Sequence, residues 1–336
     1  MRVTVRGAGV AGLACAVELA ERGASVEVLE RAAALAGAGC SWFAGGMLAP
    51  WCELENGGAL IARLGEEGIA WWRRQFPATA QLGTLVIAHR RDAGELMQFA
   101  RRTAHYETLG ADAIAALEPE LAGRFASALY FANEGHLEPR AALAALLQRA
   151  LALGVSVRFG VDAAAALPTG RELLDCTGLA ARRTFPELRG VRGEMLLVRA
   201  PDVSLSRPVR VLHPRLPVYV VPRGDARYMI GATMIESDSA QRISARSMLE
   251  LLSAAYALHP AFGEAEILDT GVGLRPAFPD NLPHIRRAGG ALYVNGLYRH
   301  GFLLAPALAR RAAAVLLEGR HFAEVMDENP RQRRLA

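Results

Sequence analysis

Residues 2–30 read RVTVRGAGVAGLACAVELAERGASVEVLE, and this stretch decides the fold. Residues 2–6 are rich in β-branched side chains and predict a strand. Residues 10–22 predict a helix that stops at Gly23, and residues 25–29 predict a second strand. Strand, glycine-rich turn, helix and strand in this order form a βαβ unit. We therefore predict an α/β domain that begins at the N-terminus.

The turn of this unit, GAGVAG at residues 7–12, fits a dinucleotide-binding loop. Gly7 would permit the tight turn, Gly9 would let the backbone approach a pyrophosphate, and Gly12 would allow close packing of helix on strand. The helix N-terminus offers free amides to phosphates. Glu30 would accept hydrogen bonds from ribose hydroxyls and disfavours the 2′-phosphate of NADP. The alternative is a structural turn with a solvated Glu30, and the motif alone does not separate FAD from NAD.

Composition excludes several classes of function. All 38 basic residues are arginine, so neither a pyridoxal phosphate enzyme nor a P-loop protein, which both need a lysine, is compatible with the chain. The net charge is only +4 and no long basic run precedes the last residues, which argues against nucleic acid as a partner. A hydrophobic content of 52% indicates a globular protein.

The four cysteines, at positions 15, 40, 52 and 176, show neither a CxxC pair nor the spacing of metal ligands. We therefore expect no disulfide framework and no metal site. The N-terminus lacks the pattern of a signal peptide, and the most apolar segment, residues 141–154, is interrupted by Gln148 and Arg149. These features predict a cytoplasmic protein that does not cross a membrane.

Further elements follow from the pattern of apolar and turn residues along the chain. The predicted strands are 84–88, 128–131, 155–159, 172–176, 194–199, 218–221, 228–231 and 292–295, and the predicted helices are 141–153, 244–258 and a last one from Pro306 to about Glu318. This order predicts a discontinuous nucleotide-binding domain at 1–75, 136–190 and 270–336, with a second domain at 76–135 and 191–269. The chain would return to the first domain near Val272.

Eight segments in sequence resemble the D-amino acid oxidase family of FAD-dependent enzymes, most of all its glycine oxidase branch in thiamine biosynthesis. They are GAGVAG with Glu30, GCSWFAGGMLAP (39–50), GHLEP (135–139), RGE (192–194), YVVPR (219–223), GATM (231–234), GLRP (273–276) and GLYRHGF (296–302). The family more often has small residues where Trp42 and Phe43 stand here.

The resemblance implies a Rossmann-like FAD-binding domain and a mostly antiparallel sheet, with helices, that forms the substrate domain. It implies oxidative deamination of a small amino acid by hydride transfer to flavin N5, with oxygen reduced to hydrogen peroxide. Glycine is the expected substrate, and sarcosine, D-alanine and D-proline stay open. The glycine imine would pass to thiazole synthase, and the family often forms homo-oligomers.

The resemblance also implies a set of cofactor contacts in the loops named above. These residues are Gly7, Gly9, Val10, Ala11, Gly12, Glu30, Arg31, Cys40, Ser41, Gly45, Gly46, Met47, Ala163, Thr177, Gly178, Leu297, Tyr298, Arg299, His300, Gly301, Phe302 and Leu303. The helix after the last loop would direct its N-terminal dipole at the flavin pyrimidine ring.

Four residues are expected to act on the substrate. Arg275 in GLRP would bind the carboxylate with two parallel hydrogen bonds, unless it forms a structural ion pair. Tyr219 would donate to the same carboxylate or serve in packing. Met234 would limit the pocket or fill the core. Arg299 would contribute to the substrate site, with an ion pair in its loop as the rival interpretation. No general base is required, because orientation and the flavin carry the reaction.

Three alternative functions remain open from the sequence. A related dehydrogenase would pass its electrons to a membrane quinone, but no membrane-facing stretch is evident. A non-catalytic flavin-binding subunit would tolerate the loss of Arg275. A plain NAD dehydrogenase would leave the arginine and tyrosine motifs unexplained.

Overall fold

A computed structural model describes residues 1–37, 39–162 and 170–326. In this part of the chain six strands form one sheet, in which all pairs except β16–β17 are parallel. In spatial order they are β16 (His284–Ala288), β17 (Ala291–Asn295), β9 (Glu172–Asp175), β1 (Arg2–Arg6), β2 (Ser25–Glu30) and β8 (Ser156–Phe159). The predicted βαβ unit is confirmed, with β1 between β9 and β2 inside this sheet.

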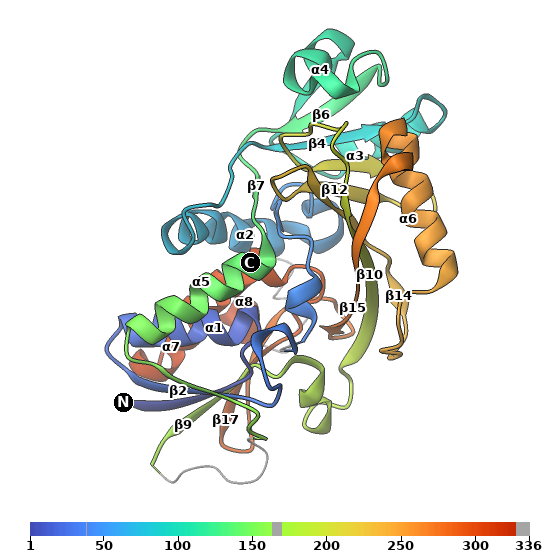
Figure 1. The fold of residues 1–336 in the computed structure, drawn as a ribbon. Helices are drawn as coiled ribbons and strands as arrows, with labels where there is room; N and C mark the ends of the chain where they lie inside the picture. Colours follow the sequence, from blue (N-terminus) through green and yellow to red (C-terminus); the bar gives the residue numbers. More distant parts are fainter. Residues whose placement is uncertain (38, 163–169, 327–336) are drawn as a thin grey trace.

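A second sheet contains nine of the described strands and is mostly antiparallel, with β4 and β11 as its parallel pair. Its order is β14 (Ile235–Glu236), β10 (Arg189–Arg199), β13 (Arg227–Gly231), β12 (Val218–Pro222), β11 (Val209–Leu212), β4 (Thr84–Ala88), β6 (Ser127–Phe131) and β5 (Glu107–Gly110), while β15 (Glu266–Ala277) also pairs with β10. Two short strands, β3 (Met47–Leu48) and β7 (Gly135–His136), form a separate antiparallel pair. In Figure 1 β7 lies between the two larger sheets. The predicted fold class is confirmed.

Helices α1, α5 and α7 gather on one side of the six-stranded sheet, whereas α6 covers the larger sheet (Figure 1). The described helices are α1 (Val10–Glu21), α2 (Leu54–Gln75), α3 (Ala93–Arg101), α4 (Ala111–Leu117), α5 (Pro139–Ala152), α6 (Ala245–Leu258), α7 (Gly301–Glu318) and α8 (Ala323–Met326). Their ends follow local chemistry: the Ser244 side chain caps α6, and Gly319 ends α7 in the left-handed conformation.

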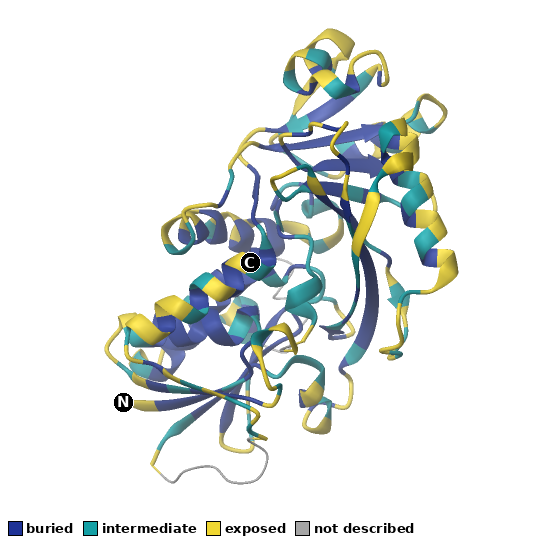
Figure 2. Cartoon of the chain, in the orientation of Figure 1, coloured by how far each residue is buried: buried dark blue, intermediate teal, exposed yellow. Residues whose placement is uncertain are grey.

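Each sheet has its own hydrophobic core, visible as the dark strands and helix faces of Figure 2. Val3 and Val5 of β1 and Leu13 of α1 are fully buried in the first core, which α7 and α5 complete. Leu85 of β4 and Ile230 of β13 are fully buried in the second. Cys15, Cys40, Cys52 and Cys176 are free thiols, as expected.

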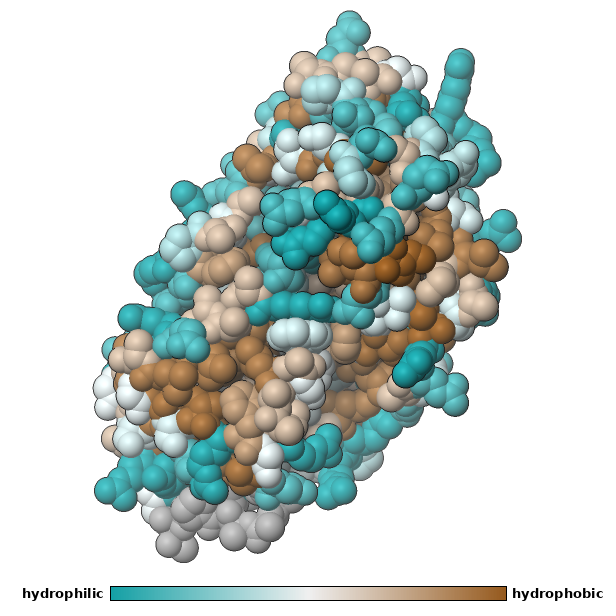
Figure 3. Space-filling view, in the orientation of Figure 1, coloured by the Kyte–Doolittle hydropathy of each residue, from teal (hydrophilic) through white to brown (hydrophobic). Residues whose placement is uncertain are grey.

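The surface shows no single dominant apolar area on the face that Figure 3 displays, where hydrophobic side chains form separate patches among hydrophilic ones. Among the described residues, no helix combines the length and the apolar character that a membrane span requires. The same part of the chain contains no cluster of three or more His, Cys, Asp or Glu side chains arranged to bind a metal ion.

The predicted start of the last helix is wrong. Pro306 lies inside α7, which begins at Gly301. A proline inside a helix leaves the carbonyl four residues earlier without its usual N–H donor. Here the indole Nε1 of Trp72 donates to the Phe302 carbonyl at 2.6 Å and replaces that hydrogen bond. The helix therefore continues through Pro306, and it begins five residues earlier than predicted, inside the GLYRHGF segment.

The predicted return of the chain to the first domain near Val272 is also displaced. Residues 270–277 belong to β15, which pairs with β10 along the larger sheet, and the chain re-enters the six-stranded sheet only at β16. The boundary drawn between 269 and 270 therefore falls inside a strand. The reason is that β15 continues as one long strand through Gly271 and Gly273 and pairs with β10 over this whole length.

Candidate functional site

A pocket opens where the two sheets meet, at the N-terminal ends of α1 and α7. Its walls come from the start of α1, the segment 40–53, strands β10 to β12, the end of β15 and residues 298–303. The predicted residues on its lining are Val10, Cys40, Ser41, Gly45, Gly46, Met47, Tyr219, Met234, Arg275, Tyr298, Arg299, His300, Gly301, Phe302 and Leu303. The structure thus brings together segments that are far apart in the sequence.

The GAGVAG turn is built so that only glycine fits at two positions. Gly7 has φ +94°, and a Cβ there would lie 2.8 Å from the carbonyl oxygen of Cys176. A Cβ on Gly12 would lie 1.9 Å from the Gly7 carbonyl oxygen. No side chain caps the helix at Gly9, and the Val10 amide donates to Ser41 Oγ at 3.2 Å. The N-terminus of α1 is therefore available to an anionic ligand.

Glu30 lies beneath this turn at the end of β2. Its carboxylate accepts hydrogen bonds from the amides of Ala8 at 2.7 Å and Ala32 at 2.8 Å. Each carboxylate oxygen has a further lone pair that a ribose hydroxyl could use. The neighbouring Arg31 is exposed, and Gly9 and Ala11 are half-buried.

The remaining expected cofactor contacts lie off the pocket lining. Thr177 follows β9, and both its amide and its hydroxyl donate to Asp175 Oδ1. The Gly178 carbonyl accepts from Asn295 Nδ2 at 2.8 Å, and Leu297 is buried between β17 and α7. Ala163 lies outside the described residues. These positions place Thr177 and Gly178 beside the GAGVAG turn, at the carboxyl ends of the central strands.

One side of the pocket, which we call the Arg275 wall, consists of Gly193, Tyr219 and Arg275. Arg275 Nη1 donates to the Thr233 carbonyl at 3.0 Å, and among the described residues no carboxylate pairs with this guanidinium. A Cβ on Gly193, in the neighbouring strand β10, would lie 2.2 Å from Arg275 Nη2. Glycine at 193 therefore makes the space in which the guanidinium lies. The half-buried Arg275 presents unused donors to the pocket.

Tyr219 of β12 faces the loop that lines the opposite edge of this wall. A Cβ on Gly45 would lie 3.0 Å from the Tyr219 hydroxyl, so the two groups are in direct contact. Met234 is 50% exposed, and its sulfur accepts from Tyr298 Oη at 3.7 Å and Arg299 Nη1 at 3.3 Å. Met234 therefore lies at the rim of the pocket and does not fill the core.

The loop 40–47 is held by side chains from the larger sheet and from α5. Arg223, at the end of the YVVPR motif, donates to the carbonyls of Leu137 at 2.9 Å and Gly45 at 2.6 Å. Burial lowers the pKa of this guanidinium to about 10, so it stays charged. Phe43 lines the pocket and packs where Gly271 leaves room, while Arg140 lies over the Trp42 ring. Trp42 and Phe43, the two bulky residues that depart from the family pattern, are thus accommodated by packing against Arg140 and at Gly271.

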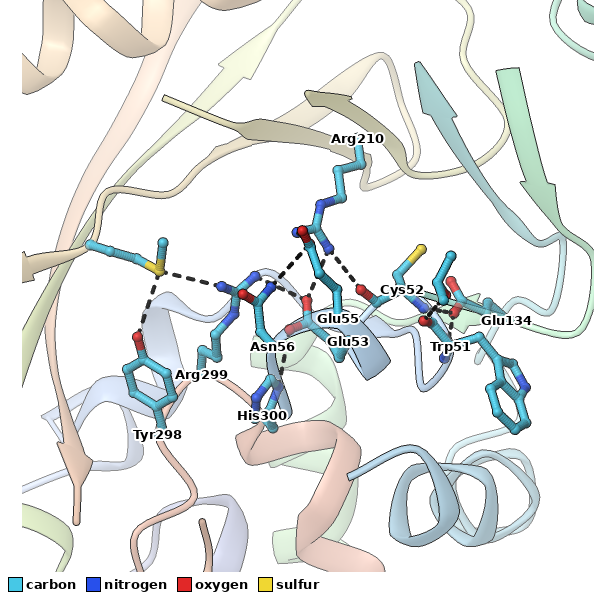
Figure 4. A network of polar contacts seen from close by, with 12 residues as sticks. Trp51, Cys52, Glu53, Glu55, Asn56, Glu134, Arg210, Tyr298, Arg299 and His300 are labelled. Atoms are coloured by element: carbon cyan, nitrogen blue, oxygen red, sulfur yellow. Dashed lines mark hydrogen bonds and ion pairs between the residues drawn. The ribbon is translucent and has the colours of Figure 1, made fainter. Parts of the chain in front are cut away.

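A second part of the lining, which we call the Glu53 wall, consists of Glu53, Arg210, Arg299 and His300 (Figure 4). Glu53 Oε1 accepts from Arg299 Nη2 at 3.0 Å and from Arg210 Nη1 at 3.3 Å. Burial would raise the pKa of Glu53, but the charge of Arg299, with that of His300 in its protonated form and that of Arg210, lowers it to about 2. Arg299 therefore forms the ion pair that was the rival interpretation of this residue.

His300 completes this wall as the N-terminal cap residue of α7. Its Nδ1 lies 3.6 Å from Glu53 Oε2, and burial lowers the pKa of the imidazole to about 4. The ring is therefore neutral near pH 7, and the two arginines provide the charge that balances Glu53. Neither Glu53 nor Arg210 is predicted from the sequence. The only signal for Glu53 is an acid shortly after the GCSWFAGGMLAP segment.

These features fit an elongated dinucleotide. The uncapped N-terminus of α1 suits its pyrophosphate, Glu30 suits a ribose, and the loop 40–47 and residues 298–303 border the deeper space. The second helix N-terminus, at Gly301, also opens onto the pocket without a side-chain cap. The residues present therefore offer a place for the whole cofactor, from adenosine to ring system.

Comparison with known proteins gives the same family throughout. The model of the DAO family, described as FAD dependent oxidoreductase, matches residues 2–315. The chain is 55% identical over 324 residues to the putative thiamine biosynthesis oxidoreductase ThiO of Rhizobium etli, covering 94% of this chain and 97% of that protein. It is 25% identical to the bifunctional protein ThiO/ThiG of Nostoc, of which it spans 52%.

Among solved structures, the glycine oxidase of Geobacillus kaustophilus superposes with a TM-score of 0.80 at 26% identity, over 96% of each chain. The shared fold, the dinucleotide turn and the match across almost the whole chain agree. The protein belongs to the DAO family of FAD-dependent oxidoreductases.

Proposed function

We propose that this enzyme oxidises a small amino acid, with glycine as the first candidate. FAD, when bound, would supply the two-electron redox chemistry of this reaction, with oxygen as the final electron acceptor. The overall reaction converts amino acid, oxygen and water into 2-oxo acid, ammonia and hydrogen peroxide. The protein's part is to bind the substrate carboxylate and to orient its Cα–H bond.

The observation that carries this proposal is the state of Arg275. It is a pocket guanidinium whose hydrogen bond goes to a backbone carbonyl, and within the described residues it has no acidic partner. Arginine binds a carboxylate with two parallel, charge-assisted hydrogen bonds. A substrate carboxylate would supply the missing counter-charge, and Tyr219 on the same wall would donate a further hydrogen bond.

The pocket favours a short substrate. Phe43, Tyr219 and Met234 line the pocket together with Arg275. These bulky side chains favour an amino acid with a small side chain. Sarcosine and D-alanine are the next candidates after glycine, since each adds one methyl group.

The N-terminus of α7 supports a role for residues 301–303 beside the cofactor. This end of the helix opens onto the pocket, and its dipole stabilises negative charge nearby. We assign cofactor binding to residues 1–75, to 136–190 and to the chain after β15. Substrate binding belongs to residues 76–135 and to the segment from 191 to the end of β15.

A place in thiamine biosynthesis is supported by the names of two relatives, ThiO of Rhizobium etli and ThiO/ThiG of Nostoc. In the fused relative the ThiO part continues into a second activity, which supports hand-off of the imine to a thiazole synthase. A strain that lacks the gene should then require the thiazole precursor for growth. Unaltered growth without that precursor would remove this pathway.

The direct test is an anaerobic flavin-bleaching screen of the holoenzyme with glycine, sarcosine, D-alanine and D-proline, followed by peroxide detection in air. We expect glycine to bleach the flavin and air to restore it with release of peroxide. A flavin that none of these amines reduces would overturn the proposal. Bleaching without peroxide in air would instead identify a dehydrogenase with another electron acceptor.

A further inference from the structure

Three arginines line the pocket, and they differ in what balances their charge. Arg210 and Arg299 share the carboxylate of Glu53, whereas Arg275 has only the Thr233 carbonyl among the described residues. The three side chains come from β11, from the segment before α7 and from β15. Glu53, at the start of α2, is thus the one described acid that meets two pocket arginines (Figure 4).

The position of Glu53 makes its charge felt inside the pocket. Its Oε1 binds both arginines, and its Oε2 is buried without a hydrogen-bond partner. With a pKa of about 2 the group is ionised throughout the physiological range. A second carboxylate brought to this side would find Arg299 and Arg210 already hydrogen-bonded to Glu53, and it would add a second negative charge beside that carboxylate.

We propose that Glu53 determines the charge specificity of the pocket: by occupying Arg299 and Arg210, it leaves Arg275 to bind one carboxylate and excludes ligands that carry a second. This inference rests on the proposed role of Arg275. It makes Glu53 a specificity residue, which acts on the ligand through its charge and through the arginines it holds.

The structure gives a physical reason why removing this charge would change selectivity. Arg299 also contacts Met234 at the pocket rim, so its guanidinium faces the space that a substrate side chain would enter. Glutamine at position 53 keeps the size of the side chain but balances neither arginine. A ligand carboxylate could then take the place of Glu53 as the partner of Arg299.

The test compares isosteric ligands that differ only in one charge. Malonate and malonamate are titrated against the holoenzyme by flavin absorbance and by thermal shift, and D-aspartate and D-asparagine are compared by kcat/KM. In E53Q the preference for the diacid over its amide should rise about tenfold or more, since a charge-assisted contact is gained. E55Q is the matched control, because Glu55 lies 3.8 Å from Arg210 without lining the pocket. Its preference should stay within about twofold of wild type.

Two further variants keep the inference falsifiable if E53Q folds poorly. In R299Q the Glu53 charge is less compensated, so the preference for the diacid should fall below that of wild type. In E53Q/R299Q the gain should disappear. An unchanged preference in folded E53Q, or an equal gain in the double variant, would overturn the inference.

The result of the diacid test can be distinguished from the result of the glycine oxidation test. Binding of malonate does not require turnover, so the specificity test remains valid for an enzyme that ignores glycine. Conversely, glycine oxidation that depends on Arg275 together with an unchanged diacid preference in E53Q would leave the proposed function standing and reject the role of Glu53.

Discussion

The Arg275 wall and the Glu53 wall line the same pocket, and both present arginine to it. On the Glu53 wall the positive charge is met inside the protein, because Glu53 binds Arg299 at 3.0 Å and Arg210 at 3.3 Å. On the Arg275 wall the guanidinium lies beside Gly193 and donates to a backbone carbonyl, without an acid among the described residues.

Residue type alone therefore does not identify an arginine that binds a ligand, and its partners within the protein must be known. A buried ion pair that is already complete gains little from a ligand, whereas an uncompensated buried charge costs free energy until a ligand balances it. The wall that is incomplete in the protein is therefore the one suited to bind an anion. The variants below test whether Arg275 differs from the paired arginines of the Glu53 wall.

The largest effect is expected from R275A. Loss of a buried charge pair with the ligand should lower kcat/KM for the substrate by about 2–5 kcal/mol, or roughly 30-fold to several thousand-fold. Bound FAD, followed by its absorbance, should be retained. R275K should recover only part of the activity, because lysine lacks the paired donors. Wild-type kinetics in R275A would show that the two walls are equivalent.

The second prediction concerns acid stability, measured by urea unfolding between pH 7 and pH 2. The folded pKa of Glu53, about 2, lies below its ordinary value of 4.5, so its contribution is complete above pH 4.5 and is lost as pH falls toward 2. Ionised Glu53 contributes about 3 kcal/mol to the free energy of unfolding. In E53Q the fall of this free energy between pH 4.5 and pH 2, which we call the acid limb, should be smaller by a similar amount.

Glu134 offers the matched contrast, because it accepts hydrogen bonds from the amides of Trp51 and Cys52 immediately before Glu53. Burial raises its pKa to about 7 despite these amides. The contribution of protonated Glu134 to stability is therefore complete below pH 4.5 and is lost as pH rises through 7. E134Q should change how the free energy of unfolding varies between pH 4.5 and pH 7, and it should leave the acid limb unchanged. Parallel acid limbs in E53Q and wild type would contradict the assignment.

A smaller effect is expected from G193A. The added Cβ would lie 2.2 Å from the Arg275 guanidinium and would displace it. The cost of such overpacking is about 2 kcal/mol, which should raise KM roughly 30-fold. G94A is the control, since a Cβ at Gly94 of α3 meets nothing within 4 Å. An unchanged KM in G193A would mean that Arg275 does not need its observed position.

The smallest effect is expected from Y219F. Removal of one hydroxyl donor should weaken binding of the substrate carboxylate by about 1.5 kcal/mol, which corresponds to a KM about tenfold higher. The aromatic ring keeps its contact with Gly45. Steady-state kinetics in air would measure this. A change in kcat alone would assign Tyr219 to a role other than carboxylate binding.

The sequence predicted those parts of the molecule in which local chemistry determines the structure. The GAGVAG turn requires glycine at positions 7 and 12 for steric reasons that act within the βαβ unit, so the fold class followed from a short stretch. Strand β4 was predicted with its observed bounds for a similar reason, since its apolar run is bordered by turn residues.

The parts that were not predicted depend on partners distant in the chain. Pro306 indicated a helix start, and only the indole of Trp72, contributed by α2, explains why α7 begins earlier. Glu53 belongs to no recognised motif, and its partners Arg210 and Arg299 lie in other elements. No spacing rule relates these positions, so the Glu53 wall could be recognised only in three dimensions.

The ion pair between Glu53 and Arg299 has a consequence for the order in which the enzyme matures on the ribosome. The nascent chain exposes the GAGVAG turn almost at once, yet the opposite border of the ligand site is translated near the end. Until then Glu53 has no Arg299 and the N-terminal βαβ unit lacks the helix that packs against α1. We therefore expect the flavin to bind stably only after α7 has been synthesised.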